Sequence, residues 1–337
     1  MSNNASAIEQ VQLTRLRQLS ARIGGNPLLT QASTGNTSIK LGSVLWIKAS
    51  GRWLADAMQQ EILIPLNLAE VRERVQRRVN PTDLYERASI ETAMHAVLPH
   101  PVVLHVHSVN TIAWAVRKDA RAQLESQLDG LPWQWVSYVP SGLPLAGEIE
   151  RVVAASAGAN VFVLGNHGLV IGGESCDAVE DLLLQVEQRL AISPRRADAI
   201  GYSALQKIAQ GSAWELPPDD GVHALAIDPA SQAILSRGIL YPCQSIFSES
   251  ITPELFCSVP CPHSRDQWEG RYRARPFLII EGCGVLVRRT MTPSQRAMMS
   301  GLAQVVQRIN SSAPIHYLTD EEVAYSVRSI ASAGRYV

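Results

Sequence analysis

The sequence is poor in cysteine, in charge and in long apolar runs, and each shortage excludes a class of protein. Five cysteines among 337 residues are too few, and odd in number, for a disulfide framework, so we expect a reducing, cytoplasmic location. No apolar run is long enough to cross a bilayer, and the first residues, MSNNASAIEQVQLTRLRQL, lack the apolar segment of a secretion signal. We therefore expect no membrane partner.

The charge balance gives no sign of a nucleic-acid partner. Charged residues make up 18% of the chain and the formal net charge is -1, whereas nucleic-acid binders usually show a basic excess. The most basic stretch, residues 72–78 (RERVQRR), alternates with Glu and Val, which is typical of a solvated helix face. Hydrophobic residues make up 46%, so the composition is that of a globular protein.

Helical and strand patterns alternate along the chain, which predicts an α/β fold. Apolar spacing predicts helices over residues 7–24, 83–98, 109–116, 147–157 and 177–190. Runs of β-branched and apolar residues predict strands over 37–41, 44–48, 102–106, 161–164 and 169–171. The pattern loosens near residues 193–196, and residues 214–221 (WELPPDDG) have the composition of a linker. We therefore expect a catalytic domain over residues 1–195 and a C-terminal α/β extension over residues 196–337.

The C-terminal extension repeats one feature of the first domain. Residues 161–171 and 277–287 each read as an apolar strand, a Gly-x-x-Gly turn and a second strand, and a helix follows both. Cys283 stands where the first copy has His167. The layout predicts a degenerate repeat whose second copy has lost a metal ligand. Cys257 and Cys261, with His263 nearby, could bind a metal, but no second ligand pair is evident, which favours a structural role.

His105 and His107 form an H-x-H motif on a predicted strand. Side chains two apart on a strand point to the same face, so both imidazoles can reach one metal ion. Two surface or hydrogen-bonded histidines are the alternative, because an H-x-H motif by itself is common.

Two further residues favour the metal. His167 lies in a turn flanked by glycines, which allow positive φ and leave room around a ligand. Glu91 lies on the predicted helix before the H-x-H strand, where a carboxylate among Ala, Ile and Met side chains needs a partner. His95, four residues later, is either a group behind the ligands or a capped core histidine. Three imidazoles leave one coordination position open, as in catalytic zinc sites, where zinc polarises a carbonyl and a carboxylate moves a proton.

These motifs together resemble the class II aldolase/adducin family, across roughly residues 12–190. The resemblance rests on five segments in the family's order and spacing: Gly35-Asn36-Thr37-Ser38, Ser50-Gly51, Ser89-Ile90-Glu91 with His95, His105-Val106-His107, and Asn166-His167-Gly168. The sequence is most similar to the aldolase part of bifunctional rhamnulose-phosphate aldolase/dehydrogenase-like proteins, and we expect no dehydrogenase half within residues 1–337.

The resemblance implies a three-layer α/β/α sandwich with a mainly antiparallel central sheet, assembled as a homotetramer. It also implies roles for nine residues: Zn2+ or another divalent transition metal on His105, His107 and His167; Glu91 as the catalytic base; Tyr138 as a proton donor in a neighbouring subunit's site; and substrate contacts from Asn36, Ser50, Gly51 and Ser89. Lys48 is a further candidate for a substrate contact. For Tyr138 an ordinary buried aromatic is the alternative. One departure matters. Ile90 replaces a serine and cannot donate a hydrogen bond to phosphate, while Lys48 could supply a cation there or simply end a strand in solvent.

The resemblance predicts a metal-dependent aldehyde-lyase that cleaves a small ketose or ketose phosphate through a metal-stabilised enediolate. The same chemistry also serves decarboxylases, epimerases and dehydratases that act on sugar acids. A non-enzymatic, adducin-like interaction protein is the third alternative, because a fold does not fix a reaction.

Overall fold

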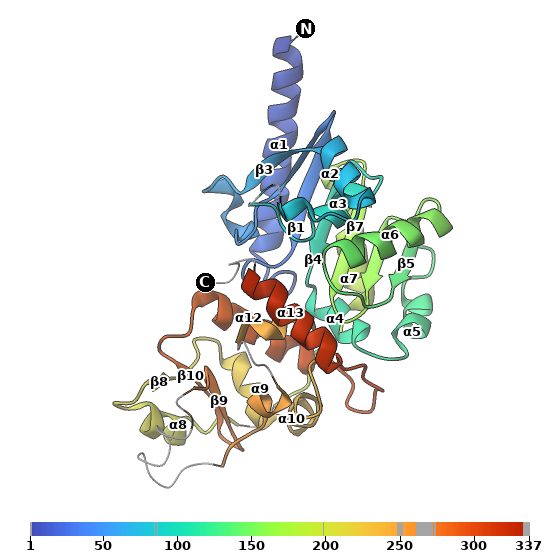
Figure 1. Ribbon diagram of the computed structural model, residues 1–337. Coiled ribbons are helices and arrows are strands. Elements are labelled where there is room, and N and C mark those ends of the chain that lie inside the picture. The colour runs from blue at the N-terminus through green and yellow to red at the C-terminus, as the bar shows by residue number, and fades with distance from the viewer. Residues whose placement is uncertain are drawn as a thin grey trace. The chain divides into compact units, whose positions relative to one another are not determined.

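The computed structural model describes residues 2–83, 85, 87–197, 199–247, 252–260, 272 and 274–332. The chain forms two compact units, one of Met1–Ala115 with Asp119–Ala191 and the other of Val116–Lys118 with Ile192–Val337 (Figure 1). Within the described residues, no helix is both long and apolar enough to cross a membrane.

A seven-stranded sheet with the order β3-β2-β1-β4-β7-β6-β5 forms the centre of the first unit. All neighbouring strands are antiparallel except β5 and β6. The strands are β1 (Asn36–Leu41), β2 (Val44–Lys48), β3 (Leu63–Asn67), β4 (Val102–Val106), β5 (Trp133–Val136), β6 (Val161–Leu164) and β7 (Gly168–Gly173). The mainly antiparallel α/β sheet predicted for the chain is therefore present.

Helices cover both faces of this sheet and produce three layers (Figure 1). One face packs against α1 (Ser2–Gly24), α4 (Val109–Ala115), α5 (Ala120–Gln127) and α7 (Cys176–Leu190). The other face packs against α2 (Leu68–Gln76), α3 (Thr92–Val97) and α6 (Leu143–Ala155). Alternation along β4 explains the sandwich: Leu104 belongs to the first core and Val103 to the second, because neighbouring strand side chains point to opposite faces.

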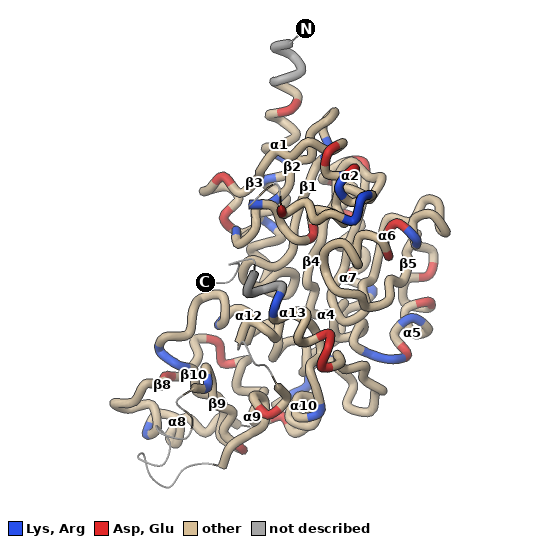
Figure 2. The backbone as a smooth tube through the Cα atoms, viewed as in Figure 1, with Lys and Arg blue, Asp and Glu red and all other residues tan. Residues whose placement is uncertain are grey.

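Acidic and basic residues alternate along α2 (Figure 2). Arg72, Glu73 and Arg77 are exposed, whereas Val71 and Val75 are buried. The basic stretch is thus a solvated helix face, as its composition indicates.

The predicted helix over residues 83–98 is wrong in its first half. The chain forms a short 3-10 turn, η2 (Pro81–Asp83), and α3 begins only at Thr92. Between them the backbone bonds elsewhere, since the Arg87 carbonyl accepts from the Ser50 N–H (2.9 Å) and the Ser89 Oγ accepts from the Glu91 N–H (3.3 Å). Competing bonds of this kind draw a segment out of a helix. Glu91 consequently lies at the N-terminal cap of α3 rather than within a helix.

The second unit contains a three-stranded antiparallel sheet with the order β8-β10-β9. Its elements are α8 (Tyr202–Ala209), β8 (Trp214–Glu215), η3 (Asp220–His223), α9 (Ala224–Ile227), α10 (Pro229–Leu235), η4 (Pro242–Phe247), η5 (Pro253–Phe256), β9 (Phe277–Ile280), β10 (Gly284–Arg288), α12 (Pro293–Val306) and α13 (Asp320–Ser332). The expected linker over residues 214–221 is wrong: it contains β8, and the Trp214 side chain is only 1% exposed.

The two hairpins compared in the sequence have the same register. Leu164 pairs with Gly168 and Ile280 pairs with Gly284, so three residues close each turn. Outside the hairpin the surroundings differ, because β7 pairs with β4 whereas β10 pairs with the two-residue strand β8. The similarity is confined to the hairpin, and a duplication stays a prediction.

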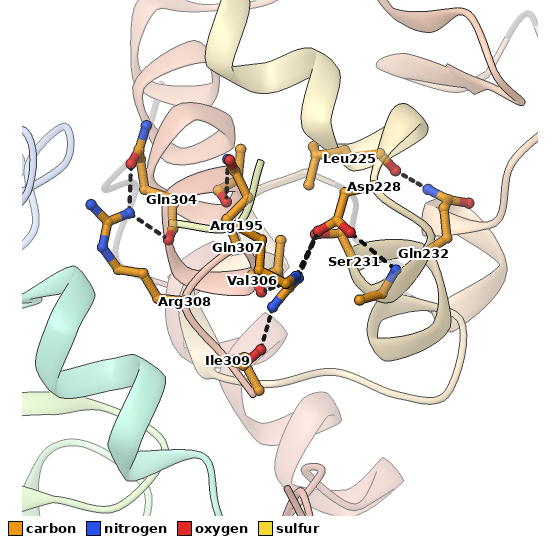
Figure 3. A network of polar contacts seen from close by, with 12 residues as sticks. Arg195, Leu225, Asp228, Ser231, Gln232, Gln304, Val306, Gln307, Arg308 and Ile309 are labelled. Atoms are coloured by element: carbon orange, nitrogen blue, oxygen red, sulfur yellow. Dashed lines mark hydrogen bonds and ion pairs between the residues drawn. The ribbon is translucent and has the colours of Figure 1, made fainter. Parts of the chain in front are cut away.

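A partly buried ion pair lies at the start of the second unit. The Arg195 Nη2 lies 2.6 Å from the Asp228 Oδ2, and the Ser231 hydroxyl donates to the same oxygen (2.6 Å) (Figure 3). The guanidinium also donates to the carbonyls of Val306 and Ile309 (Figure 3). One side chain therefore ties the chain at residue 195 to α10 and to the end of α12.

Candidate metal centre and active site

His105 lies on β4 and points to the face that α3 covers. It shares that face with Val103, two residues earlier, and its side chain is completely buried. Its Nδ1 lies 3.0 Å from the Leu169 carbonyl oxygen on β7. Because a carbonyl only accepts, Nδ1 carries the proton and the Nε2 lone pair faces the cluster.

Three imidazoles converge on one point beyond the end of β4. The ring centroids of His105, His107 and His167 lie 4.9 to 5.1 Å apart, and the Nε2 atoms of His105 and His107 are 3.1 Å apart. All three side chains are buried. The sequence predicted that the H-x-H pair shares a face, and the structure adds His167 to it.

The β6–β7 hairpin carries His167 to this point. β7 pairs with β4 in a register that sets Val106 opposite Leu169. At Gly168 the backbone lies so close to β4 that an added Cβ would be 2.5 Å from the Val106 carbonyl oxygen. Asn166 has a positive φ of 51° and turns the chain before His167. Glycine at 168 is thus a requirement of close backbone packing.

Glu91 completes the cluster. Its Oε1 lies 3.3 Å from the His105 Nε2 and 3.2 Å from the His167 Nε2, and the side chain is buried. The other carboxylate oxygen, Oε2, accepts from the Asn36 Nδ2 at 2.5 Å. Glu91, His105, His107 and His167 each offer one ligand atom, and all four atoms lie within 4.8 Å of one another.

The electrostatics favour an ionised carboxylate at Glu91 and neutral rings at His107 and His167. Burial raises the pKa of Glu91, but the charges and hydrogen bonds of His105 and His167 outweigh it and hold that pKa well below its ordinary value. Burial lowers the pKa of His107 well below its ordinary value, and burial also lowers that of His167. Neutral imidazole and ionised carboxylate are the forms that bind a metal.

The arrangement fits a divalent transition metal. Nitrogen lone pairs and a carboxylate oxygen, packed 3.1 to 3.3 Å apart, repel one another unless a proton or a metal cation lies between them. A tetrahedral zinc ion with ligands at 2.0–2.1 Å would separate them by about 3.3 Å. In the described part of the chain this is the one group of three or more such side chains.

Four of the five predicted substrate contacts meet on neighbouring segments. Asn36 begins β1 opposite His105, and its Nδ2 also donates to the Ser89 Oγ at 3.4 Å. Ser50 and Gly51 form the turn after β2, where Gly51 has a φ of +72°. The Ser50 N–H donates a hydrogen bond to the Arg87 carbonyl. Among the described residues, the buried Asn36 Oδ1 and Ser50 Oγ have no hydrogen-bond partner. Unpaired buried acceptors and donors indicate a missing polar ligand.

The remaining predicted residues have other surroundings. The Lys48 side chain is 2% exposed, and its Nζ donates to the carbonyls of Ser33 (2.6 Å) and Arg52 (2.8 Å). The strand end that it occupies is therefore not in solvent. Tyr138 follows β5, two strands beyond β7 in the sheet. Cys257 is free and partly buried, while Cys261 and His263 lie outside the described residues.

Sequence reasoning missed the groups that orient the ligands. These are mostly backbone atoms, such as the Leu169 carbonyl at His105, and no residue pattern marks them.

His95 is a completely buried histidine whose Nδ1 lies 2.7 Å from the Ser38 Oγ, and burial lowers its pKa to about 3. It is a neutral core histidine capped by the Ser38 hydroxyl, the second of the two alternatives that the sequence left open.

Residues 16–193 match the family model described as the class II aldolase and adducin N-terminal domain. The chain belongs to this family. The match covers more than half of the chain and includes every member of the histidine cluster. A buried group that could bind a metal thus lies within the family domain.

Known members of the family share this domain with modest identity. The uncharacterized oxidoreductase YuxG of Bacillus subtilis is 28% identical over 188 residues, which are 49% of this chain but only 27% of that protein. Among solved structures, the N-terminal class II aldolase domain of a Thermoplasma acidophilum protein is 22% identical, with a TM-score of 0.46 over 52% of this chain and 90% of that one. L-Fuculose-1-phosphate aldolase from Thermus thermophilus is 17% identical, with a TM-score of 0.38 over 53% and 91%.

Proposed function

We propose that the protein is a metal-dependent lyase of the class II aldolase type that cleaves a small ketose or ketose phosphate. One observation carries the proposal: three imidazoles and a carboxylate, each offering one ligand atom, meet within 4.8 Å in a buried site. A structural zinc site is usually closed by four Cys or His ligands, whereas three imidazoles leave a position for substrate. The family also contains adducin, but a scaffold has no need of this cluster.

His105, His107 and His167 would hold the ion, which we propose to be zinc. When bound, zinc polarises a substrate carbonyl and stabilises negative charge on the adjoining oxygens. The chain's own part begins with His105, whose Nδ1–H bond to Leu169 fixes the ring so that Nε2 faces the ion. Burial of all three rings keeps bulk water away from the site.

Glu91 would act as the base. Its depressed pKa keeps the carboxylate ionised at neutral pH, ready to take a proton from the carbon beside the carbonyl in the synthetic direction. In the cleavage direction a base takes the proton of the hydroxyl at the cleaved bond, the bond between the two carbons breaks and an aldehyde leaves. The Glu91 carboxylate would first take up a proton from solvent and then deliver it to the carbon that keeps the electron pair. The Asn36 amide holds Oε2, while Oε1 faces the Nε2 atoms of His105 and His167.

Tyr138 is proposed as the proton donor and acceptor for the hydroxyl at the cleaved bond. In a homotetramer of the kind proposed here, it would act in a neighbouring subunit's site. Asn36, Ser50, Gly51 and Ser89 would contact the polar end of the substrate.

A substrate panel with two readouts tests the proposal. The purified protein, loaded with zinc, is given ketose phosphates, free ketoses and sugar acids, and aldehyde and carbon dioxide release are measured separately. Aldehyde release that His167→Ala abolishes and His316→Ala retains supports the lyase. Carbon dioxide without aldehyde identifies a decarboxylase instead. A purified protein that holds less than about one-tenth equivalent of transition metal, and binds none on titration, contradicts a metal-dependent mechanism altogether.

A further inference from the structure

Lys48 is the one buried lysine beside the proposed active site, and its ammonium group is directed at the protein backbone. The side chain ends β2 and is 2% exposed. Its Nζ donates to the Ser33 carbonyl at 2.6 Å and to the Arg52 carbonyl at 2.8 Å. A buried charge is costly unless it is hydrogen-bonded, so these two carbonyls are part of what stabilises it.

The two carbonyls belong to the two loops that carry substrate-contact residues. Ser33 lies three residues before Asn36, in a loop with two positive φ angles, at Ala32 (54°) and Gly35 (71°). Arg52 directly follows Ser50 and Gly51, where the φ of Gly51 is +72°. Positive φ at a non-glycine residue costs free energy, so a loop of this shape needs outside contacts to hold it.

The first loop also sets the position of Glu91. An added Cβ at Gly35 would lie 2.8 Å from the His105 carbonyl oxygen, so this loop packs directly on the strand that carries the metal ligands. Asn36 then donates to the Glu91 Oε2. A displacement of the loop would therefore move the amide that orients the proposed base.

We propose that Lys48 is a positioning residue: its ammonium group joins the loop before Asn36 to the loop after Ser50 and so holds the substrate side of the site in its working shape. This inference rests on the proposed function only for the identity of the site. In this role Lys48 does not contact a substrate phosphate, which was the role considered from the sequence. Its ammonium group donates to two backbone carbonyls and is enclosed by the protein.

The test compares Lys48→Met with Lys40→Met. Methionine fills the space of the lysine stem but removes the charge and the donors. Lys40 is the matched control, since it lies on the neighbouring strand β1, is partly buried and donates to a different carbonyl, that of His100 (2.7 Å). Each variant is measured for zinc content, for amide hydrogen exchange, and for binding of glycolohydroxamate, a small two-oxygen zinc ligand that resembles an enediolate.

We expect Lys48→Met to bind zinc as the wild type does, because no histidine changes. Exchange should become about tenfold faster in residues 30–36 and 49–53 and stay unchanged in α7. Glycolohydroxamate should bind about tenfold more weakly, as is usual when a group that orients active-site residues is lost. Lys40→Met should match the wild type in all three measurements.

Wild-type exchange in both loops of Lys48→Met would overturn the inference, and so would wild-type hydroxamate affinity or the same defects in Lys40→Met. If Lys48→Met does not fold, Lys48→Gln, which is neutral, polar and shorter, is judged by the same criteria. A wild-type protein that binds zinc and hydroxamate but cleaves no sugar refutes the proposed reaction alone, because the loop and binding measurements need no turnover.

Discussion

The Nδ1 of His105 and the carbonyl oxygen of Leu169 lie 3.0 Å apart across the β4–β7 pair. The pairing of β4 with β7 places this carbonyl beside the His105 ring. The strand pairing therefore decides which nitrogen of this candidate metal ligand is protonated. A neutral imidazole that donates from Nδ1 has its lone pair on Nε2, the atom that faces His107 and Glu91.

The tautomer of His105 can be observed directly. In metal-free protein at neutral pH we expect the proton of the neutral ring on Nδ1, with slow solvent exchange because the side chain is completely buried. Long-range nitrogen–proton NMR of the histidine rings measures this. A protonated Nε2 on neutral His105 would contradict the arrangement.

Replacement of Glu91 should separate metal binding from catalysis. Glu91→Gln keeps the size of the side chain and its contact with Asn36 but removes the base, so turnover should fall about 10²- to 10⁴-fold while zinc stays bound. Steady-state kinetics with zinc analysis measures both quantities. Glu187→Gln is the matched control, because that carboxylate also accepts from an asparagine amide, that of Asn110, but lies on α7. Equal activity in the two variants would remove Glu91 from the mechanism.

The close approach of β7 to β4 predicts an effect of Gly168→Ala on zinc affinity. The new methyl group would lie 2.5 Å from the Val106 carbonyl oxygen, so one strand must move and carry His167 with it. We expect zinc affinity to fall about 10- to 100-fold, as for other losses of ligand orientation.

A second alanine variant is the control for Gly168. Gly158 has a positive φ of 87° but no atom within 4 Å of an added Cβ. Gly158→Ala should therefore destabilise the fold by about 1–2 kcal/mol through backbone strain and leave zinc affinity unchanged. Zinc titration against a competing chelator measures the affinities, and equal affinities in the two alanine variants would contradict the packing argument.

The ion pair of the second unit predicts a pH-dependent stability. Burial raises the pKa of Asp228, but the hydrogen bonds from Arg195 and Ser231 outweigh it and keep that pKa below its ordinary value. A carboxylate with a depressed pKa stabilises the fold above its unfolded pKa, and that stabilisation disappears as the pH falls through its folded pKa.

Asp228→Asn should therefore lower the free energy of unfolding by about 2 kcal/mol at pH 7, because it leaves a largely buried guanidinium without its charged partner. The difference from wild type should begin to shrink below about pH 4, where the unfolded wild-type carboxylate takes up a proton, and should disappear as the pH falls through the lower folded pKa. Urea unfolding at several pH values measures it, with exposed Asp181→Asn as the control. A difference that stays constant down to pH 3 would show that charge plays no part.

Local pattern predicted most of the sheet because those strands are encoded by their own residues, but it gave no strand over the residues of β3. Alternation over residues 102–106 correctly placed His105 with His107, and the predicted strands at 44–48 and 161–164 have the bounds of β2 and β6. The helix over residues 83–98 failed because its first half bonds to the turn at Ser50, which lies far away in sequence.

The candidate site was predictable as a set of residues but not as a geometry. The family pattern supplied His167 and Glu91 as partners of His105, whereas their contact depends on strand pairing and on a loop that no periodicity describes. Lys48 shows most clearly which contacts could not be predicted from the sequence. Its residue type suggested a phosphate partner, and only the structure shows its ammonium group bonded to the Ser33 and Arg52 carbonyls.

The most direct test of the account is X-ray absorption at the zinc edge on wild-type protein loaded with one equivalent of zinc. We expect a first shell of nitrogen and oxygen only, at about 2.0–2.1 Å, with the multiple scattering of three imidazoles. His167→Ala should lose one of those imidazoles. A sulfur shell at about 2.3 Å, or a wild-type protein that binds no zinc, would contradict the metal centre on which the proposed function rests.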